Sequence, residues 1–319
     1  FAVFPFTRLV AGTSVGNGAM IVTLIIGSAP YVARMVESSL LEVDNGVIEA
    51  AESMGASTIE IIFKVLIPEA KPALITGATS GIGEGCARRF ARGGYNLILT
   101  GRNTGKLEIL KKELEAEGVE VLALAFDVRN REAAKKAVDY IPEEWRNVDV
   151  LINNAGLARG LEPEYEGDFE DWDQMIDTNI KGLLTMTRLI VPGMVERNHG
   201  HVINIGSVAG DAAYAGGNVY CATKAAVKAI TDGLRIDVAH TKVRVTNVKP
   251  GLVETNFSNI RFHGDQNRAD NVYRGIEPLN GDDVADVAFY AASAPEHVQI
   301  AEVQVLATHQ ANGTVIHRS

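Results

Sequence analysis

The chain has 319 residues, which is enough for two average domains or for one large α/β domain with an extra segment. Its 46% hydrophobic and 22% charged residues are typical of a globular protein and exclude a wholly disordered chain. The net charge of -10 argues against a general nucleic-acid binder, which needs a basic surface. With two cysteines and seven histidines that lack ligand spacing, we expect no metal site and a reducing, cytoplasmic location.

The first 70 residues differ in character from the rest of the chain. Leu9–Ala33 contains no charged residue, and a membrane-spanning helix needs about 20 apolar residues. Four glycines and Pro30 weaken this candidate span. A buried helical hairpin packed on a soluble domain is the alternative.

The sequence EAAESMGASTIEIIFKVLIP follows at Glu49–Pro68. It resembles the EAA loop of ABC-importer inner-membrane permeases, and PFTRLVAGTSVG and APYVARMVESSLLEV are similar to the D-methionine type. Val65 and Ile67 depart from that family's Ile and Leu. The resemblance implies a separate, mostly helical segment over 1–70, through which a membrane or an ABC ATPase would be contacted. One span cannot form a translocation pathway, so we expect a fused fragment or an assembly chimera rather than a transporter.

From residue 71 onward, short apolar runs alternate with amphipathic segments. This alternation predicts a doubly wound parallel sheet with helices on both faces, and a ligand site at the carboxyl ends of its strands. A polar, irregular stretch over Phe257–Tyr273 is expected to close as a lid. The predicted strands are Ala73–Thr76, Tyr95–Thr100, Val121–Ala125, Val148–Ile152, His201–Ile205, Val243–Val248 and Glu302–Leu306. The predicted helices are Ile82–Arg92, Leu107–Glu117, Glu132–Tyr140, Trp172–Asn198 and Gly216–His240.

A glycine-rich turn, Gly77–Gly83, joins the first strand to the first helix. Glycines there let the backbone approach a pyrophosphate at the helix N-terminus, although such a motif alone is equally compatible with a tight turn. Arg102 ends the second strand and favours the 2′-phosphate of NADP, the alternative being a solvated surface arginine. After the third strand, Asp127 either meets the adenine or caps the next helix.

Asparagines mark two further positions. Asn153-Asn154-Ala155-Gly156 follows the fourth strand, where small residues permit close approach to a cofactor and Asn side chains can join neighbouring strand ends. Asn179 lies inside the long predicted helix, where its helix propensity is unfavourable, which indicates a role there. An exposed helix residue is the alternative.

Ser207, Tyr220 and Lys224 are the candidates for the chemistry. Tyr220 and Lys224 are four residues apart, so they share a helix face. A nearby ammonium and a positive nicotinamide ring would lower the pKa of the phenol, allowing it to act as general acid or base. Ser207 can bond a carbonyl oxygen where charge develops. The Tyr-x3-Lys pair becomes specific only together with the glycine turn, Asn-Asn-Ala-Gly and Ser207.

These motifs resemble the short-chain dehydrogenase/reductase family over residues 71–319. The resemblance implies a seven-stranded Rossmann-type sheet, and dimers or tetramers joined through the helices that carry Asn179 and Tyr220. It implies a tetrad of Asn179, Ser207, Tyr220 and Lys224, in which Lys224 bonds the nicotinamide ribose and Asn179 holds a relay water. The expected cofactor contacts are Gly77, Thr79, Ser80, Gly81, Ile82, Arg102, Asp127, Val128, Asn154, Ala155, Gly156, Tyr220, Lys224, Pro250, Gly251, Val253 and Thr255.

Three segments suggest a subgroup: GLVETNFSNIRFHGD, PGMVERNHGHVINIGS and YAGGNVYCATKA resemble NADP-dependent 3-hydroxy acid dehydrogenases. The implied reaction is hydride transfer between NADP(H) and a small 3-hydroxy acid such as L-allo-threonine, serine or 3-hydroxypropionate. Another carbonyl or alcohol substrate is the alternative, and the intact Tyr220–Lys224 pair argues against a binding module without activity. The expected substrate contacts are Ser207, Tyr220 and Arg261. Of these, Arg261 is the candidate to bind the carboxylate, with Arg159 or Arg268 as alternatives.

Overall fold

The computed structural model describes residues 71–318. The helical segment, membrane span and EAA loop expected within residues 1–70 lie outside the described residues. Among the helices that are described, none is both long and apolar enough to cross a bilayer.

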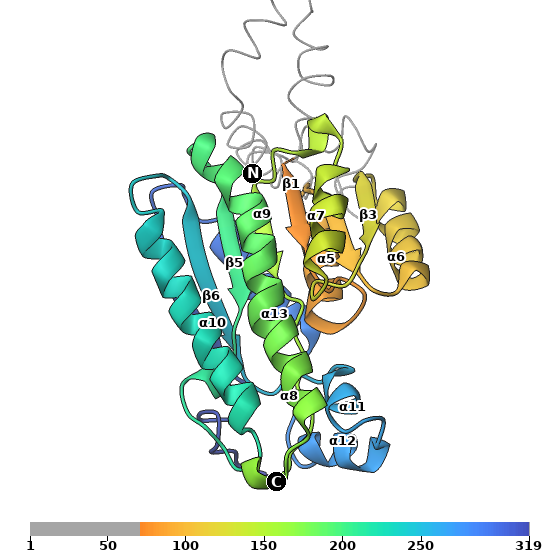
Figure 1. Cartoon of the computed structure of the whole chain (residues 1–319), viewed down its shortest axis with the longest axis vertical. Helices are drawn as coiled ribbons and strands as arrows, with labels where there is room; N and C mark the ends of the chain where they lie inside the picture. The colour runs from red at the N-terminus through yellow and green to blue at the C-terminus, as the bar shows by residue number, and fades with distance from the viewer. Residues whose placement is uncertain (1–70, 319) are drawn as a thin grey trace, which may run out of the picture. The chain divides into compact units, whose positions relative to one another are not determined.

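Seven parallel strands form one sheet in the order β3-β2-β1-β4-β5-β6-β7 (Figure 1). The chain order reverses between β1 and β4, and such a reversal opens a crevice at the carboxyl ends of the strands. The predicted sheet is therefore confirmed. The strands are β1 (Pro72–Ile75), β2 (Asn96–Gly101), β3 (Val121–Ala125), β4 (Val150–Asn153), β5 (His201–Ile205), β6 (Arg244–Pro250) and β7 (Glu302–Val305).

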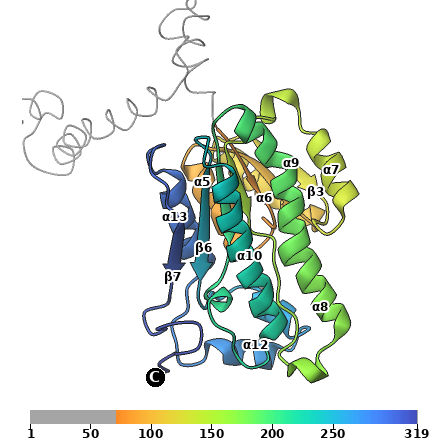
Figure 2. The same ribbon diagram turned by 60° about the vertical axis from the view of Figure 1, so that its left-hand side comes forward.

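Helices cover both faces of the sheet (Figure 2). Ala73 and Ile75 of β1 pack with α5 (Gly81–Arg92), α6 (Thr104–Ala116) and α13 (Gly281–Ala292). Leu74, between them, packs with the opposite layer. That layer contains α7 (Arg131–Asp139), α9 (Leu183–Glu196) and α10 (Asn218–Asp237). Because successive strand residues point to opposite faces, a sheet covered on both sides needs such continuous apolar strands.

The long helix predicted over Trp172–Asn198 is confirmed, since the chain is helical throughout 169–196, but a π turn interrupts its α-helical geometry. It consists of α8 (Phe169–Ile176), a π turn η4 (Asp177–Gly182) and α9. Gly182 packs so tightly that an added Cβ would lie 2.8 Å from Val128 Cγ2. The apolar pattern continues through the π turn, so this change of geometry could not be predicted from it, although such turns frequently occur at functional sites.

The segment Phe257–Tyr273 was predicted to be irregular, and that prediction is wrong. It contains the helices α11 (Phe257–Arg261) and α12 (Gln266–Tyr273). Asp265 caps α12 by accepting a bond from Arg268 N. Helix α13 was not predicted either, although Asn280 and Asp283 form a capping box at its start, a signal readable in sequence.

A histidine is buried at the start of β5. His201 Nε2 lies 2.7 Å from Thr246 Oγ1, and Thr246 donates its own hydroxyl proton to Ile300 O. His201 Nε2 is therefore the donor, and Nδ1 has no hydrogen-bond partner among the described residues. Burial, together with the charge of Arg244, lowers the pKa of His201 well below its ordinary value. The folded protein thus holds this ring neutral.

We expect the free energy of unfolding to fall as the pH drops below about 6.5, because the unfolded chain then protonates His201 while the folded chain does not. The loss from this one group is about 1.4 kcal/mol per pH unit until the lowered pKa is reached. Urea titrations between about pH 7 and pH 5 measure this slope. His201→Gln should flatten it, whereas the exposed-site control His240→Gln should not; equal slopes in both variants would refute the assignment.

Candidate functional site

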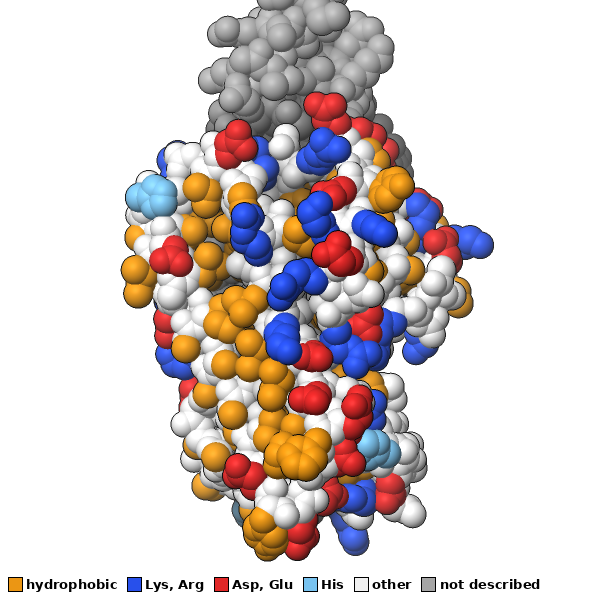
Figure 3. All heavy atoms as spheres, in the orientation of Figure 1, with side chains coloured by type: hydrophobic (Ala, Val, Ile, Leu, Met, Phe, Trp, Pro, Cys, Tyr) orange, Lys and Arg blue, Asp and Glu red, His pale blue; other side chains and the backbone are white. Residues whose placement is uncertain are grey.

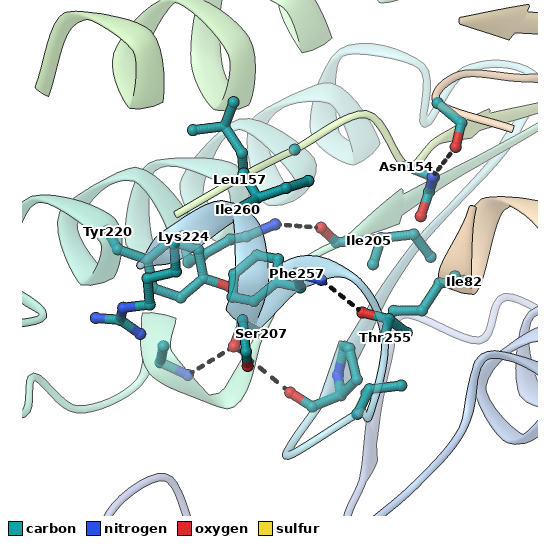
Figure 4. A pocket seen from close by; sticks show the side chains of 18 of the residues that line it. Ile82, Asn154, Leu157, Ile205, Ser207, Tyr220, Lys224, Thr255, Phe257 and Ile260 are labelled. Atoms are coloured by element: carbon teal, nitrogen blue, oxygen red, sulfur yellow. Dashed lines mark hydrogen bonds between the residues drawn. The ribbon is translucent and has the colours of Figure 1, made fainter. Parts of the chain in front are cut away.

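A cavity of about 500 Å³ lies at the carboxyl ends of the central strands (Figure 4). Every expected cofactor contact lines it, and so do Ser207 and Arg261. Asn179, Arg159 and Arg268 do not. The cavity has the size of ordinary small-molecule sites.

The glycine turn forms one end of the cavity. Gly77 and Gly81 adopt left-handed backbone angles, with φ of 65° and 58°. Helix α5 begins at Gly81, and the preceding Ser80 makes no side-chain bond to its first N–H groups. These N–H groups are thus available to an anionic ligand, and glycines let it approach the backbone closely. Asn154 Nδ2 donates to Thr76 O and Gly77 O at 2.9 and 3.1 Å and so joins two strand ends, as predicted.

Two charged residues lie at the ends of β2 and β3. The Arg102 side chain is 58% exposed, and its guanidinium is 4.0 Å from Asp127 Oδ2. Asn130, not Asp127, caps α7, so the capping alternative for Asp127 is wrong. Burial raises the pKa of Asp127, but the bonds from Arg129 outweigh that effect and the pKa is lowered. Arg129 was not predicted to take part in this group.

Ser207, Tyr220 and Lys224 meet in the middle of the cavity (Figure 4). Lys224 Nζ donates to Ile205 O at 2.8 Å and lies 5.9 Å from the centre of the Tyr220 ring. Ser207 Oγ accepts a bond from Ala209 N and donates to Pro250 O at 3.5 Å. A hydroxyl, a phenol and an amine therefore face one space.

The ionisation of Tyr220 differs from the expectation. Burial, the largest effect, raises the pKa of Tyr220 above its ordinary value, and Tyr214 raises it further; Ser207 and Arg261 lower it. Burial also lowers the pKa of Lys224 to about 8. Lys224 is thus a weaker source of positive charge than an exposed lysine, so desolvation of the phenol prevails in the protein alone.

The side chain of Asn179 bonds the backbone of Leu157 and a threonine of α10. Its Nδ2 donates to Leu157 O and Thr223 Oγ1 at 2.8 and 3.0 Å, and its Oδ1 accepts from Leu157 N at 2.9 Å. The side chain is buried, so the exposed-residue alternative is wrong. It fixes Leu157, which lines the cavity, while the relay water remains a prediction.

Arg261 is the half-buried cation of the site. Its Nε donates to Gly160 O, and its Nη1 donates to Tyr214 Oη at 2.8 Å. Its guanidinium carbon is 5.8 Å from the Tyr220 ring centre, and no described carboxylate pairs with it. Arg159 instead bonds Ile260 O, and Arg268 pairs with Glu162. Arg261 thus lines the cavity, whereas Arg159 and Arg268 do not, and the binding of a carboxylate by Arg261 stays a prediction.

Other lining residues carried no sequence signal. The Phe257 ring packs edge-on against Tyr220, with centroids 5.6 Å apart. Near the end of the chain, Gln310 accepts a bond from Leu252 N, and Arg318 donates to Val272 O. Each of these contacts joins segments that are distant in sequence, so no local motif marks them.

Residues 71–265 match the short chain dehydrogenase family. The chain belongs to this family. Over 248 residues this dehydrogenase is 50% identical to an NADP-dependent 3-hydroxy acid dehydrogenase of Salmonella typhi, covering 77% of the chain and 99% of the relative. Sulfoacetaldehyde reductase 2 of Chromohalobacter salexigens is 46% identical over 239 residues, or 75% of the chain and 94% of that relative.

A solved structure agrees in fold. The closed form of serine dehydrogenase complexed with NADP+ aligns with a TM-score of 0.74 and 47% identity, covering 78% of this chain and all of that one. Residues 1–85 match a second family, the binding-protein-dependent transport system inner membrane component. The permease resemblance of the N-terminal segment is therefore confirmed, and the two matches overlap across the glycine turn.

Asn179→Ala is expected to lower the free energy of unfolding by about 3 kcal/mol, because it leaves the buried N–H and C=O of Leu157 without partners. Urea denaturation measures the loss. The control Gln174→Ala, which removes an amide that bonds Glu170 near the surface, should change stability by less than about 0.5 kcal/mol. A loss no larger than that of the control would contradict the assigned role.

Proposed function

We propose that this dehydrogenase transfers hydride between NADP(H) and the C3 carbon of a small 3-hydroxy acid, and that it works in the cytoplasm. One observation carries the proposal: Ser207, Tyr220 and Lys224 face the same cavity as Arg261. A carbonyl oxygen can thus meet acid and hydrogen-bonding groups while a carboxylate meets a guanidinium. The dehydrogenase domain is residues 71–319, and the permease-like residues 1–70 form a separate domain without a catalytic role.

The cavity suits a dinucleotide phosphate. The N-terminus of α5 and the left-handed Gly77 and Gly81 suit a pyrophosphate, and Arg102 is free of any closer carboxylate than Asp127 at 4.0 Å in the described part of the chain. An arginine at the end of the second strand accommodates a 2′-phosphate. NADP supplies the hydride acceptor or donor when bound. Pro250, Gly251, Val253 and Thr255 line the cavity on the β6 side.

The residues of the chain then divide the work on the substrate. Tyr220 gives a proton to the carbonyl oxygen in reduction and takes it from the hydroxyl in oxidation. Ser207 donates a hydrogen bond to the same oxygen as charge develops there. Lys224, held by Ile205 O, presents a positive charge that favours the phenolate and a donor for the nicotinamide ribose. The pKa of Tyr220, raised in the protein alone, must fall when these charges act on it.

Arg261 binds the acid group of the substrate. Gly160 and Tyr214 hold two of its nitrogens, so the guanidinium keeps one orientation toward the cavity. An arginine without a carboxylate partner can bond an oxyanion with charge-assisted hydrogen bonds. A sulfonate is a second candidate group, because sulfoacetaldehyde and the semialdehyde of a 3-hydroxy acid both place the anion one carbon from the aldehyde.

The outer helices indicate self-association into dimers or tetramers. Hydrophobic side chains gather along the face that carries α8 and α9 (Figure 3), and exposed apolar residues include Phe169 and Leu184 there and Ile236 on α10. Monomeric proteins rarely expose large contiguous apolar surfaces. These helices also carry or adjoin Asn179 and Tyr220, so association would support the site.

Purified protein is expected to reduce NADP with 3-hydroxypropionate, serine or L-allo-threonine, followed by NADPH absorbance. Tyr220→Phe should lower kcat by about 10²-fold or more, because the proton-transfer group is lost. The control Tyr290→Phe, at an exposed ring, should leave kcat unchanged. Activity of Tyr220→Phe equal to the wild type would contradict the proposal. Turnover only with isethionate, the alcohol that corresponds to sulfoacetaldehyde, would favour the sulfonate alternative.

Arg261→Met should raise KM for the 3-hydroxy acid by about 10²-fold, because a charge-assisted pair worth roughly 2–3 kcal/mol is lost. KM for an uncharged alcohol should change little. Initial-rate kinetics with both substrates separate the two effects. Arg268→Met, which removes an arginine outside the cavity, is the matched control; if it raised KM as much as Arg261→Met, Arg261 would lose its role.

A further inference from the structure

A buried lysine next to the Ser207 turn has no part in the proposed hydride and proton transfer. Lys249 is on β6, and its side chain is only 6% exposed. Its ammonium lies 2.7 Å from Asp211 Oδ2 and 2.6 Å from Glu302 Oε1. Desolvating such a charge is costly, and a well-packed apolar side chain often serves stability equally well. The position of its two partners indicates another reason for this arrangement.

Asp211 closes the turn that Ser207 begins. Ser207 is the N-cap of the short helix η5 (Val208–Gly210), and Asp211 is its C-cap. Gly210 N donates to Ser207 O, and Asp211 N donates to Val208 O. The ion pair with Lys249 therefore holds the far end of a single hydrogen-bonded turn whose first residue carries the reactive hydroxyl.

The residue before Ser207, Gly206, is bonded to β6, the strand that carries Lys249. Gly206 N donates to Val248 O at 2.8 Å. A Cβ on Gly206 would lie 2.3 Å from Asn247 Oδ1 and 3.3 Å from Lys249 Cγ. The next residue, Pro250, offers the carbonyl to which Ser207 Oγ donates. Val248, Lys249 and Pro250 thus contact the Ser207 turn at three places. They bond Gly206 before the serine, the serine hydroxyl itself, and Asp211 at the end of the turn.

Glu302 anchors the lysine from the other side. It lies on β7 in register with Asn247, whose Nδ2 approaches its carboxylate at 3.4 Å. Lys228 of α10 is 3.8 Å from the same carboxylate and pairs more closely with Asp232. Burial disfavours the ammonium of Lys249, yet the bonds to Asp211 and Glu302 outweigh it and raise its pKa. The cation therefore remains charged while it spans the two carboxylates.

We propose that Lys249 is a positioning residue for the reaction: its ion pair with Asp211 fixes the Ser207–Asp211 turn so that the Ser207 hydroxyl faces the carbonyl oxygen of the substrate. The proposal rests on the proposed function, in which Ser207 acts on that oxygen. It differs from a purely structural role because it predicts an energetic coupling between Asp211 and Ser207.

The test compares Asp211→Asn and Lys249→Met with the matched control Lys228→Met, which removes a lysine near Glu302 but not one that contacts Asp211. The full chain is assayed with the 3-hydroxy acid that it turns over fastest. Asp211→Asn and Lys249→Met should each lower kcat about tenfold, since small displacements of a reacting group are costly. The dissociation constant of NADPH should be unchanged, and Lys228→Met should stay within about twofold of the wild type.

Coupling is measured by repeating Asp211→Asn in the Ser207→Ala background. If the ion pair acts through the serine hydroxyl, its removal causes no further loss there, as expected for residues that act as a unit. Hydrogen exchange of the amides from 208 to 211 should also be faster in Asp211→Asn than in the control.

An undiminished kcat in both variants, or the same tenfold loss with and without Ser207, would overturn the proposal. Should Lys249→Met not fold, the exposed Asp211→Asn still carries the test. Should Ser207→Ala retain full activity, the proposed function fails instead. The exchange experiment then decides the structural part, and unchanged exchange would overturn that as well.

Discussion

The hydrogen bonds around Thr76 hold the sheet together where its chain order reverses. Thr76 Oγ1 donates to Ile152 O and accepts from Asn154 N and Ala155 N, while Asn154 Nδ2 returns to the carbonyls of Thr76 and Gly77. The chain leaves the ends of β1 and β4 toward different helices, so these hydrogen bonds are what joins the two strand ends. The glycine turn, the Asn-Asn-Ala-Gly element and the cavity between them depend on this one junction.

Within that frame, burial and charge oppose each other. Tyr220, Lys224 and Arg261 are placed where water is scarce, and burial pushes the lysine and the phenol toward their neutral forms. In such a site, an added charge shifts the pKa values of its neighbours strongly, because the surroundings screen it weakly. The fold provides the dry environment, and the ligands that bind there provide the remaining charge.

Local motifs predicted much of this architecture because each occupies a few consecutive residues. The glycine turn and the Tyr-x3-Lys pair are of this kind, and the structure places them in one cavity. Helix α13 was missed, although its Asn280 cap is visible in sequence. The π turn could not be predicted, since the apolar period passes through it unbroken. The environments of Arg261 and Tyr220 were also beyond reach, because Tyr214, Gly160 and Phe257 approach them only after folding.

The π turn between α8 and α9 has a consequence for how the chain can change in length. A π turn holds one residue more than a regular α-helical turn, here within Asp177–Gly182. Deleting a single residue there would therefore restore a regular α-helix and leave α8 and α9 facing as they do now, whereas a deletion inside either helix would rotate it by about 100° against the other. The cost would be local: Asn179 would lose its place opposite Leu157, and the wall of the cavity would change while the two helices kept their packing.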